Sequence, residues 1–187
     1  MNKIKMLITF VALVYATGCT TLPASPPEWS MQKEAIVMNI KADKELNKVK
    51  GKSYSLFIVI YQLSDPNPFN QLNEDQAGLQ KLLEGKIFDP SVVNVKTRIV
   101  YPDSNMTYTF DRAQGARYIA VVAGYEVMEK ERIVKLYDVP ILVKEEFAFL
   151  SLEKSRILLP DHLKINLALG PRQIISEEDK KKEKEKD

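Results

Sequence analysis

Residues 54–63 read Tyr-Ser-Leu-Phe-Ile-Val-Ile-Tyr-Gln-Leu, a run in which almost every central side chain is aliphatic or aromatic. This composition favours a β-strand, because branched and aromatic side chains pack well on a pleated surface. A strand with hardly any polar position has no face for water, so both of its faces have to be covered. We therefore predict that residues 54–63 form a central strand of a sheet.

Shorter runs on both sides of this stretch also read as strands. Residues 35–40 are mostly apolar, and residues 93–99 and 106–110 alternate between apolar and polar side chains. Tyr-Pro-Asp-Ser-Asn at residues 101–105 is a turn sequence, so we predict that the two alternating segments form a hairpin. Further strands are expected at residues 116–127, 133–143, 147–152 and 163–169.

A different spacing follows the central strand. Asp65-Pro-Asn-Pro68 ends it, and the next apolar residues recur at roughly helical intervals, at Phe69, Leu72, Leu79, Leu82 and Leu83. We predict one amphipathic helix that ends at Gly85 and that Gly78 weakens by about 1 kcal/mol relative to Ala. About seven or eight strands with one inserted helix indicate a mainly β fold, a β-sandwich. Residues 29–176 suit a single domain with one core.

The connection between the first two predicted strands is unusually long. Residues 41–53 are polar and charged, with Gly51 as the turn residue, whereas hairpin loops usually have about two to five residues. Binding residues are often carried on loops that a rigid scaffold positions. Residues 41–53 are therefore a candidate functional segment.

The first residues have the layout of an export signal. Two lysines precede an apolar run over residues 6–16, which is too short for a span, because a helix needs about 20 residues to cross the hydrocarbon core. The sequence Ala16-Thr-Gly-Cys19 that follows is similar to the lipobox of bacterial lipoproteins. We predict a signal peptide over residues 1–18 and a lipid on Cys19 that anchors the chain in a membrane. The alternative is that this cysteine is an incidental free thiol.

The segments that flank the predicted domain differ from it in composition. Residues 19–28 are rich in Pro, Ser and Thr and suit an extended linker. Residues 177–187 hold only acidic residues and lysines, which predicts a disordered tail that either contacts a partner or keeps the chain soluble. Removing the two lysines of the signal leaves 25 of 27 basic residues against 25 acidic ones, so nucleic acid is not expected as a partner.

The chain offers few groups for catalysis. It has one histidine, His162, and no cysteine besides Cys19, and it lacks paired metal-ligand spacings, a GxSxG sequence and a glycine-rich phosphate loop. A lone histidine in Pro-Asp-His-Leu reads as a turn residue rather than a general base. We therefore predict neither an enzyme nor a cofactor, apart from the covalent lipid on Cys19.

Four short sequences follow one another in a distinctive order, namely Ala42-Asp43, Leu46-Asn47, Gly51 and Tyr61-Gln-Leu63. Together with Phe69 and residues 116–125, this order resembles the type VI secretion lipoprotein family, whose members include TssJ, SciN and VasD. The resemblance implies a transthyretin-like β-sandwich with an added helix. It also implies a structural part of an envelope-spanning secretion complex, held in the outer membrane and facing the periplasm. Thr20, where enterobacterial inner-membrane lipoproteins have Asp, resembles the outer-membrane sorting signal.

The resemblance also implies a partner. In the family, the lipoprotein holds the periplasmic C-terminal region of the inner-membrane protein TssM, which sits with TssL. The contact involves the loop between the first two strands, which corresponds here to Asp43, Lys44, Glu45, Leu46, Asn47, Lys48, Val49 and Lys50. Leu46 and Val49 are the larger apolar residues of this set, and an apolar anchor inside a charged rim is common at interfaces. The alternative is that Leu46 packs back onto the sandwich.

Two other classes of function stay open. A periplasmic lipoprotein that binds a small ligand or a folding client would use the same kind of sandwich, but it should carry exposed aromatic residues in its loops, and the loops here offer few. An envelope hydrolase would need the catalytic residues that this chain lacks.

Overall fold

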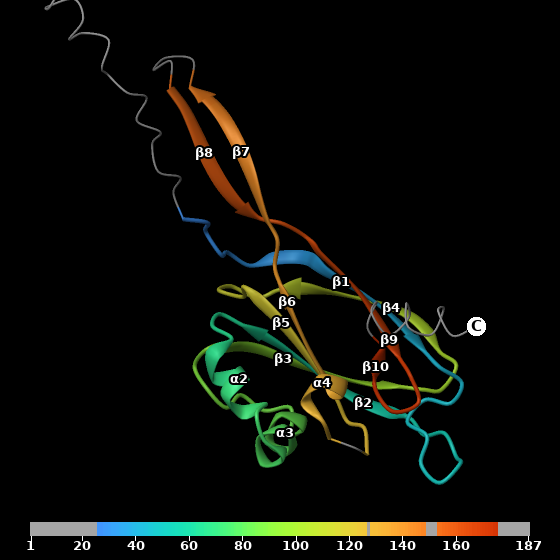
Figure 1. The fold of residues 1–187 in the computed structure, drawn as a ribbon. Helices are drawn as coiled ribbons and strands as arrows, with labels where there is room; N and C mark the ends of the chain where they lie inside the picture. Colours follow the sequence, from blue (N-terminus) through green and yellow to red (C-terminus); the bar gives the residue numbers. More distant parts are fainter. Residues whose placement is uncertain (1–25, 127, 149–152, 176–187) are drawn as a thin grey trace, which may run out of the picture. The chain divides into compact units, whose positions relative to one another are not determined.

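The computed structural model describes residues 26–126, 128–148 and 153–175 (Figure 1). The predicted signal peptide, Cys19 and the predicted tail lie outside these residues, and of the predicted linker only residues 26–28 are described. The chain divides into two compact units. Among the described residues, the larger comprises residues 27–126, 128–142 and 159–175, and the smaller comprises residues 26, 143–148 and 153–158.

The larger unit is built from two four-stranded sheets. The first contains β1 (Gln32–Ala42), β4 (Asn105–Arg112), β9 (Leu163–Leu169) and β10 (Ile174–Ile175), in the order β10-β9-β1-β4. The second contains β2 (Leu56–Leu63), β3 (Val92–Val100), β5 (Tyr118–Ala123) and β6 (Val134–Asp138), in the order β3-β2-β5-β6. β1 runs parallel to β9 and antiparallel to β4, and the second sheet is antiparallel throughout. The prediction of a mainly β fold is confirmed.

The main hydrophobic core joins the two sheets. Alternate residues of the two central strands are fully buried in it, namely Ile36, Met38 and Ile40 of β1 and Leu56, Ile58 and Ile60 of β2. The other face of β2 packs against α2 (Asn67–Leu72) and α3 (Gln76–Leu83), in a second cluster that contains Val59, Tyr61, Phe69 and Leu82. Apart from Phe57, which is exposed, β2 is therefore covered on both faces, by the first sheet and by the helices, as its composition predicts.

The segment predicted as one helix forms two. α2 ends at Leu72, and α3 begins after Asp75, whose Oδ1 accepts the Gly78 N–H at 2.7 Å and so caps the helix. A Cβ at Gly78 would stand 1.8 Å from the Leu72 carbonyl oxygen. Gly78 is therefore the residue that lets the two helices approach each other, and not a weak point inside one long helix. A further helix, α4 (Lys130–Ile133), is a single turn.

The prediction of a hairpin over residues 93–110 is wrong, although both of its strands exist. β3 lies in the second sheet beside β2, and β4 lies in the first sheet beside β1, so the turn between them crosses from sheet to sheet. The Asp103 N–H donates to the Asp43 carbonyl at 3.1 Å, and the Ala42 N–H donates to the Ser104 carbonyl at 2.9 Å. These bonds tie the turn to the end of β1. Period-two alternation predicts a strand, but it carries no information on which sheet the strand joins.

The smaller unit contains most of a two-stranded ribbon. β7 (Ile141–Ala148) pairs with β8 (Glu153–Pro160), and Glu145 lies 3.6 Å from Arg156. The single strand predicted over residues 133–143 is therefore divided, because β6 ends before Pro140 and β7 begins after it. Of the strand predicted at residues 147–152, the last four residues lie outside the described part of the chain.

Candidate functional site

Four connections lie at one end of the larger unit. They are the β1–β2 loop (residues 43–55), the turn after β3 (101–104), the segment after β5 (124–126) and the β9–β10 turn (170–173). The Asp43 N–H donates to the Leu169 carbonyl at 2.8 Å, and the Lys48 N–H donates to the Pro171 carbonyl at 2.8 Å. The β1–β2 loop, drawn in cyan in Figure 1, is thus the long loop expected from the sequence, and it is fixed to the end of the first sheet.

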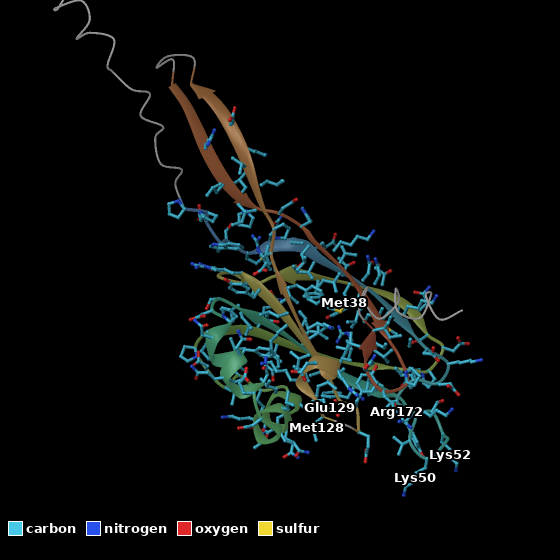
Figure 2. The ribbon with its side chains drawn as sticks, in the orientation of Figure 1. Met38, Lys50, Lys52, Met128, Glu129 and Arg172 are labelled. Atoms are coloured by element: carbon cyan, nitrogen blue, oxygen red, sulfur yellow. The ribbon has the colours of Figure 1, made fainter. Side chains whose placement is uncertain are left out.

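The β1–β2 loop has a defined tip. The Val49 N–H donates to the Lys52 carbonyl at 2.9 Å and the Lys52 N–H donates to the Val49 carbonyl at 3.0 Å, which leaves Lys50 and Gly51 as a two-residue turn. Their φ angles of 48° and 82° are both positive, as a type I′ turn requires. Lys50 and Lys52 are exposed at this tip, where Figure 2 shows them pointing away from the sheets.

Leu46 does not belong to the exposed surface of the loop. Its side chain is fully buried in the main core, and its carbonyl accepts the Tyr54 N–H at 3.1 Å. Of the two apolar residues considered as anchors for a partner, Leu46 therefore packs back onto the sandwich. The rest of the predicted contact set stays at the surface. Asp43, Lys44 and Lys50 are exposed, and Glu45, Asn47, Lys48 and Val49 are partly buried.

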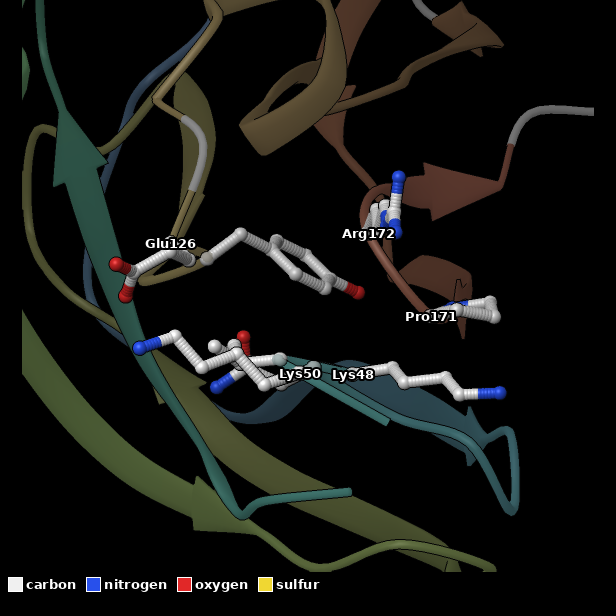
Figure 3. Close-up of a pocket in the computed structure, with 8 residues that line it drawn as sticks. Lys48, Lys50, Glu126, Pro171 and Arg172 are labelled. Carbon is white, nitrogen blue, oxygen red and sulfur yellow. The ribbon is translucent and has the colours of Figure 1, made fainter. Parts of the chain in front are cut away.

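A pocket of about 280 Å³ opens beside the loop (Figure 3). The loop lines it with Asn47, Lys48, Val49 and Lys50, and two other connections complete it with Tyr125, Glu126, Pro171 and Arg172. Sequence reasoning found only the loop side of this pocket. Gly170-Pro171 signals a turn, but its place beside the loop follows from the parallel pairing of β1 with β9, which sets Ala42 opposite Leu169.

Tyr125 holds one wall of the pocket in place. Its side chain is buried, and its hydroxyl donates to the Gln173 carbonyl at 2.9 Å and lies 3.1 Å from the Gly170 carbonyl. Burial, and secondly the Asp43 carboxylate, raise the pKa of Tyr125 well above the usual value for tyrosine. The hydroxyl therefore keeps its proton at neutral pH, and its role is to donate a hydrogen bond that fixes the β9–β10 turn.

Cations predominate in the pocket lining. Lys48, Lys50 and Arg172 are positive, and Glu126 is negative. Lys48 Nζ lies 2.5 Å from the Glu45 carboxylate, whereas within residues 26–126, 128–148 and 153–175 neither Lys50 nor Arg172 has an ion-pair partner. A fixed backbone with a partly apolar and mainly cationic lining is suited to binding.

The described residues contain no group of three or more His, Cys, Asp or Glu side chains placed to hold a metal ion. His162 lies in the connection between β8 and β9, where it is exposed, and its Nδ1 is 3.4 Å from Asp161. None of the described helices is long and apolar enough to cross a membrane.

Comparison with solved structures identifies similar folds. The type VI secretion lipoprotein TssJ1 of Pseudomonas aeruginosa is 18% identical, with a TM-score of 0.53, over 80% of this chain and 95% of that chain. Serratia marcescens Lip, a membrane-bound component of the type VI secretion system, is 17% identical, with a TM-score of 0.52, over 79% and 98%. A chain of the structure described as the TssM C-terminal domain from EAEC is 17% identical, with a TM-score of 0.53, over 75% and 94%. At these identities the likeness establishes the fold.

Sequence comparison identifies the family. No curated protein sequence matches the chain. Residues 34–168, which are most of the chain, match the family described as type VI secretion lipoprotein, VasD, EvfM, TssJ. This is a family of structural secretion-system lipoproteins and not of enzymes, and the match confirms the resemblance seen in the sequence. The chain belongs to the type VI secretion lipoprotein family.

Proposed function

We propose that this protein is the outer-membrane lipoprotein of a type VI secretion membrane complex and that it anchors the periplasmic C-terminal region of a TssM-like inner-membrane protein. The observation that carries the proposal is the family match over residues 34–168. Similar structures described as a TssM C-terminal domain and as a type VI membrane complex support a TssM-like partner. TssL, as a further member of the same complex, rests on the family resemblance alone.

The membrane end of this tether is Cys19. Each buried CH₂ of an acyl chain contributes about 0.8 kcal/mol, so two or more chains on one cysteine hold a protein stably at a bilayer. The Pro-rich linker that follows separates the lipid from the sandwich. Thr20 supports sorting to the outer membrane, with the folded part in the periplasm.

The partner end of the tether is the exposed part of residues 43–50. Val49 supplies partly exposed apolar surface at the pocket, and Lys44, Lys48 and Lys50 supply a positive rim. Rim charges of this kind speed the encounter with a partner more than they raise affinity. Because Leu46 is buried, the contact depends on Val49 and the rim.

Calorimetric titration tests this proposal. The soluble domain from Glu28 onward should bind the periplasmic C-terminal region of the TssM-like protein of the same organism with micromolar affinity or tighter, about −8 kcal/mol or better. Val49→Asp should weaken binding at least tenfold, because it places an unpaired carboxylate in the apolar contact. Ile87→Asp, at a residue 67% exposed and outside the proposed surface, should bind as the wild type does.

The outcomes separate the function from its surface. A wild-type domain that shows no binding contradicts the proposed function. Unchanged binding by Val49→Asp would keep the function and move the contact away from residues 43–50. The family match favours the tether over a small-ligand carrier, because it is to type VI secretion lipoproteins.

A further inference from the structure

The helices cover only part of the outer face of the second sheet. The Tyr61 hydroxyl of β2 donates to the Leu82 carbonyl of α3 at 2.6 Å. A Cβ at Gly85, just past the end of α3, would stand 3.0 Å from Thr97 Cγ2 and 3.8 Å from Val59 Cγ1. Thr97 and Val59 are partners across β3 and β2. The helical layer therefore covers this pair. Leu83 of α3 also reaches the β5 side of the next row, where its Cδ2 would stand 3.6 Å from a Cβ at Gly124.

The side of this row toward β3 is open. Phe57 is paired with Ile99, and these side chains are 38% and 54% exposed. Side chains two residues apart on a strand share a face, so Phe57 lies on the face of Val59. Tyr101, which is 61% exposed, follows directly after the end of β3. We call Phe57, Ile99 and Tyr101 the apolar end patch. It is a group of neighbouring large apolar side chains that the fold leaves in water.

The apolar end patch adjoins the candidate site. Phe57 comes two residues after the β1–β2 loop, and its carbonyl accepts the Gly124 N–H at 2.8 Å. Gly124 is followed directly by Tyr125 and Glu126, which line the pocket. The patch, the loop and the pocket therefore lie at the same end of the larger unit.

Charge indicates what kind of partner fits this end. Residues 43–52 of the loop contain four lysines and two acidic residues, and Lys50 and Lys52 stand at its exposed tip (Figure 2). Apolar surface beside a surplus of positive charge is complementary to a partner segment whose apolar residues are flanked by acidic residues. Grouped exposed apolar side chains rimmed by polar ones are typical of protein interfaces.

We propose that the apolar end patch docks an apolar segment of the TssM-like partner, and that acidic residues next to this segment face Lys50 and Lys52. The partner contact then extends from the loop tip onto the outer face of the second sheet, where it continues the layer begun by α3. The inference rests on the proposed function and deepens it, because it adds a second surface and states the chemistry of the partner segment.

Binding of the full-length lipoprotein in detergent to the periplasmic C-terminal region of the TssM-like protein tests the patch. Ile99→Glu should weaken binding at least tenfold, because it places a carboxylate inside the apolar contact and opposite acidic residues. Leu136→Glu is the matched control. Leu136 is 39% exposed and is paired with Ala120, a residue of the helix-side cluster, so it lies on the same face but on the far edge strand β6. It should change affinity less than about twofold.

One further variant protects the test from a folding defect, and two charge variants examine the part played by the lysines. Ile99→Thr keeps a strand-forming residue and should give a smaller loss of affinity in the same direction, with an unchanged melting temperature. Lys50→Glu combined with Lys52→Glu should weaken binding and reduce its dependence on salt, since attraction between opposite charges is screened by ions. Lys164→Glu, at an exposed lysine of β9, is the control for a charge change elsewhere.

The results distinguish this inference from the function on which it rests. If Val49→Asp loses binding while Ile99→Glu and Ile99→Thr bind as the wild type does, the contact is confined to the loop and the inference is overturned. If the wild type does not bind at all, the proposed function fails and the inference fails with it. If Ile99→Glu abolishes self-association in sedimentation and leaves partner binding intact, a second copy occupies the patch, which also overturns the inference.

Discussion

Lys50 is a lysine in a backbone conformation that favours glycine and asparagine. Its φ angle is 48°, and it forms the first position of the turn at the tip of the β1–β2 loop. A left-handed conformation costs a residue with an ordinary side chain roughly 1–2 kcal/mol. Strained residues of this kind tend to persist where they serve a function, which agrees with the place of Lys50 at the proposed contact.

Replacing Lys50 should therefore separate stability from binding. Lys50→Asn should raise the free energy of unfolding by roughly 0.5–1 kcal/mol, because asparagine tolerates the left-handed region. The same change should weaken binding to the TssM-like partner, because it removes a positive charge. Urea unfolding measures the first effect and calorimetry the second. Lys52→Asn, outside the strained turn, should leave stability unchanged, and an unstabilised Lys50→Asn would contradict the assignment of strain.

Tyr61 gives the fold a pH dependence at alkaline pH. Burial, with a smaller effect of Glu84, raises the pKa of Tyr61 to about 12, whereas tyrosine in an unfolded chain titrates near 10. The folded state therefore holds this proton more tightly than the unfolded state. The resulting stability is fully present below about pH 10 and is lost as the pH rises toward 12. Urea unfolding over this range should show the decline, and Tyr61→Phe should reduce it. An equally steep decline in that variant would assign the effect to other groups.

At the scale of elements, strands are predictable from the sequence and their neighbours are not. The composition of residues 54–63 predicts a doubly covered strand, and the structure agrees, since β2 packs on the first sheet and on the helices. The sequences of β3 and β4 alternate between apolar and polar residues, as strands do, but the two strands lie in different sheets. Which sheet each strand joins depends on hydrogen bonds between residues 103 and 104 and the end of β1. A local sequence pattern does not contain this information.

The break between α2 and α3 makes a testable prediction at this scale. Gly78→Ala should lower the free energy of unfolding by about 1–3 kcal/mol, because the added Cβ would overlap the Leu72 carbonyl oxygen and force the helices apart. If α2 and α3 formed one continuous helix, Gly78→Ala would instead raise the free energy of unfolding, since alanine favours a helix by about 1 kcal/mol over glycine. Denaturant unfolding decides between them. Gln80→Ala, at an exposed position of α3, should change stability by less than about 0.5 kcal/mol.

At the scale of the whole molecule, the candidate site joins parts that are far apart in the sequence. The loop side was predictable because residues 41–53 are too long and too charged for a simple hairpin turn. Pro171 and Arg172 were not, because they reach the loop only through the parallel pairing of β1 with β9. The position of Leu46 was not predictable from the sequence either. Whether an apolar loop residue faces a partner or the interior depends on the assembled core.

The central claim is that the protein ties a TssM-like partner to a membrane through lipid at one end and the sandwich at the other. Flotation of vesicles tests both ends together. Vesicles that carry the lipidated wild-type protein should carry the periplasmic C-terminal region of the TssM-like protein upward in a density gradient, whereas Cys19→Ser should leave both proteins at the bottom. A partner that stays at the bottom although the wild-type lipoprotein floats would contradict the claim.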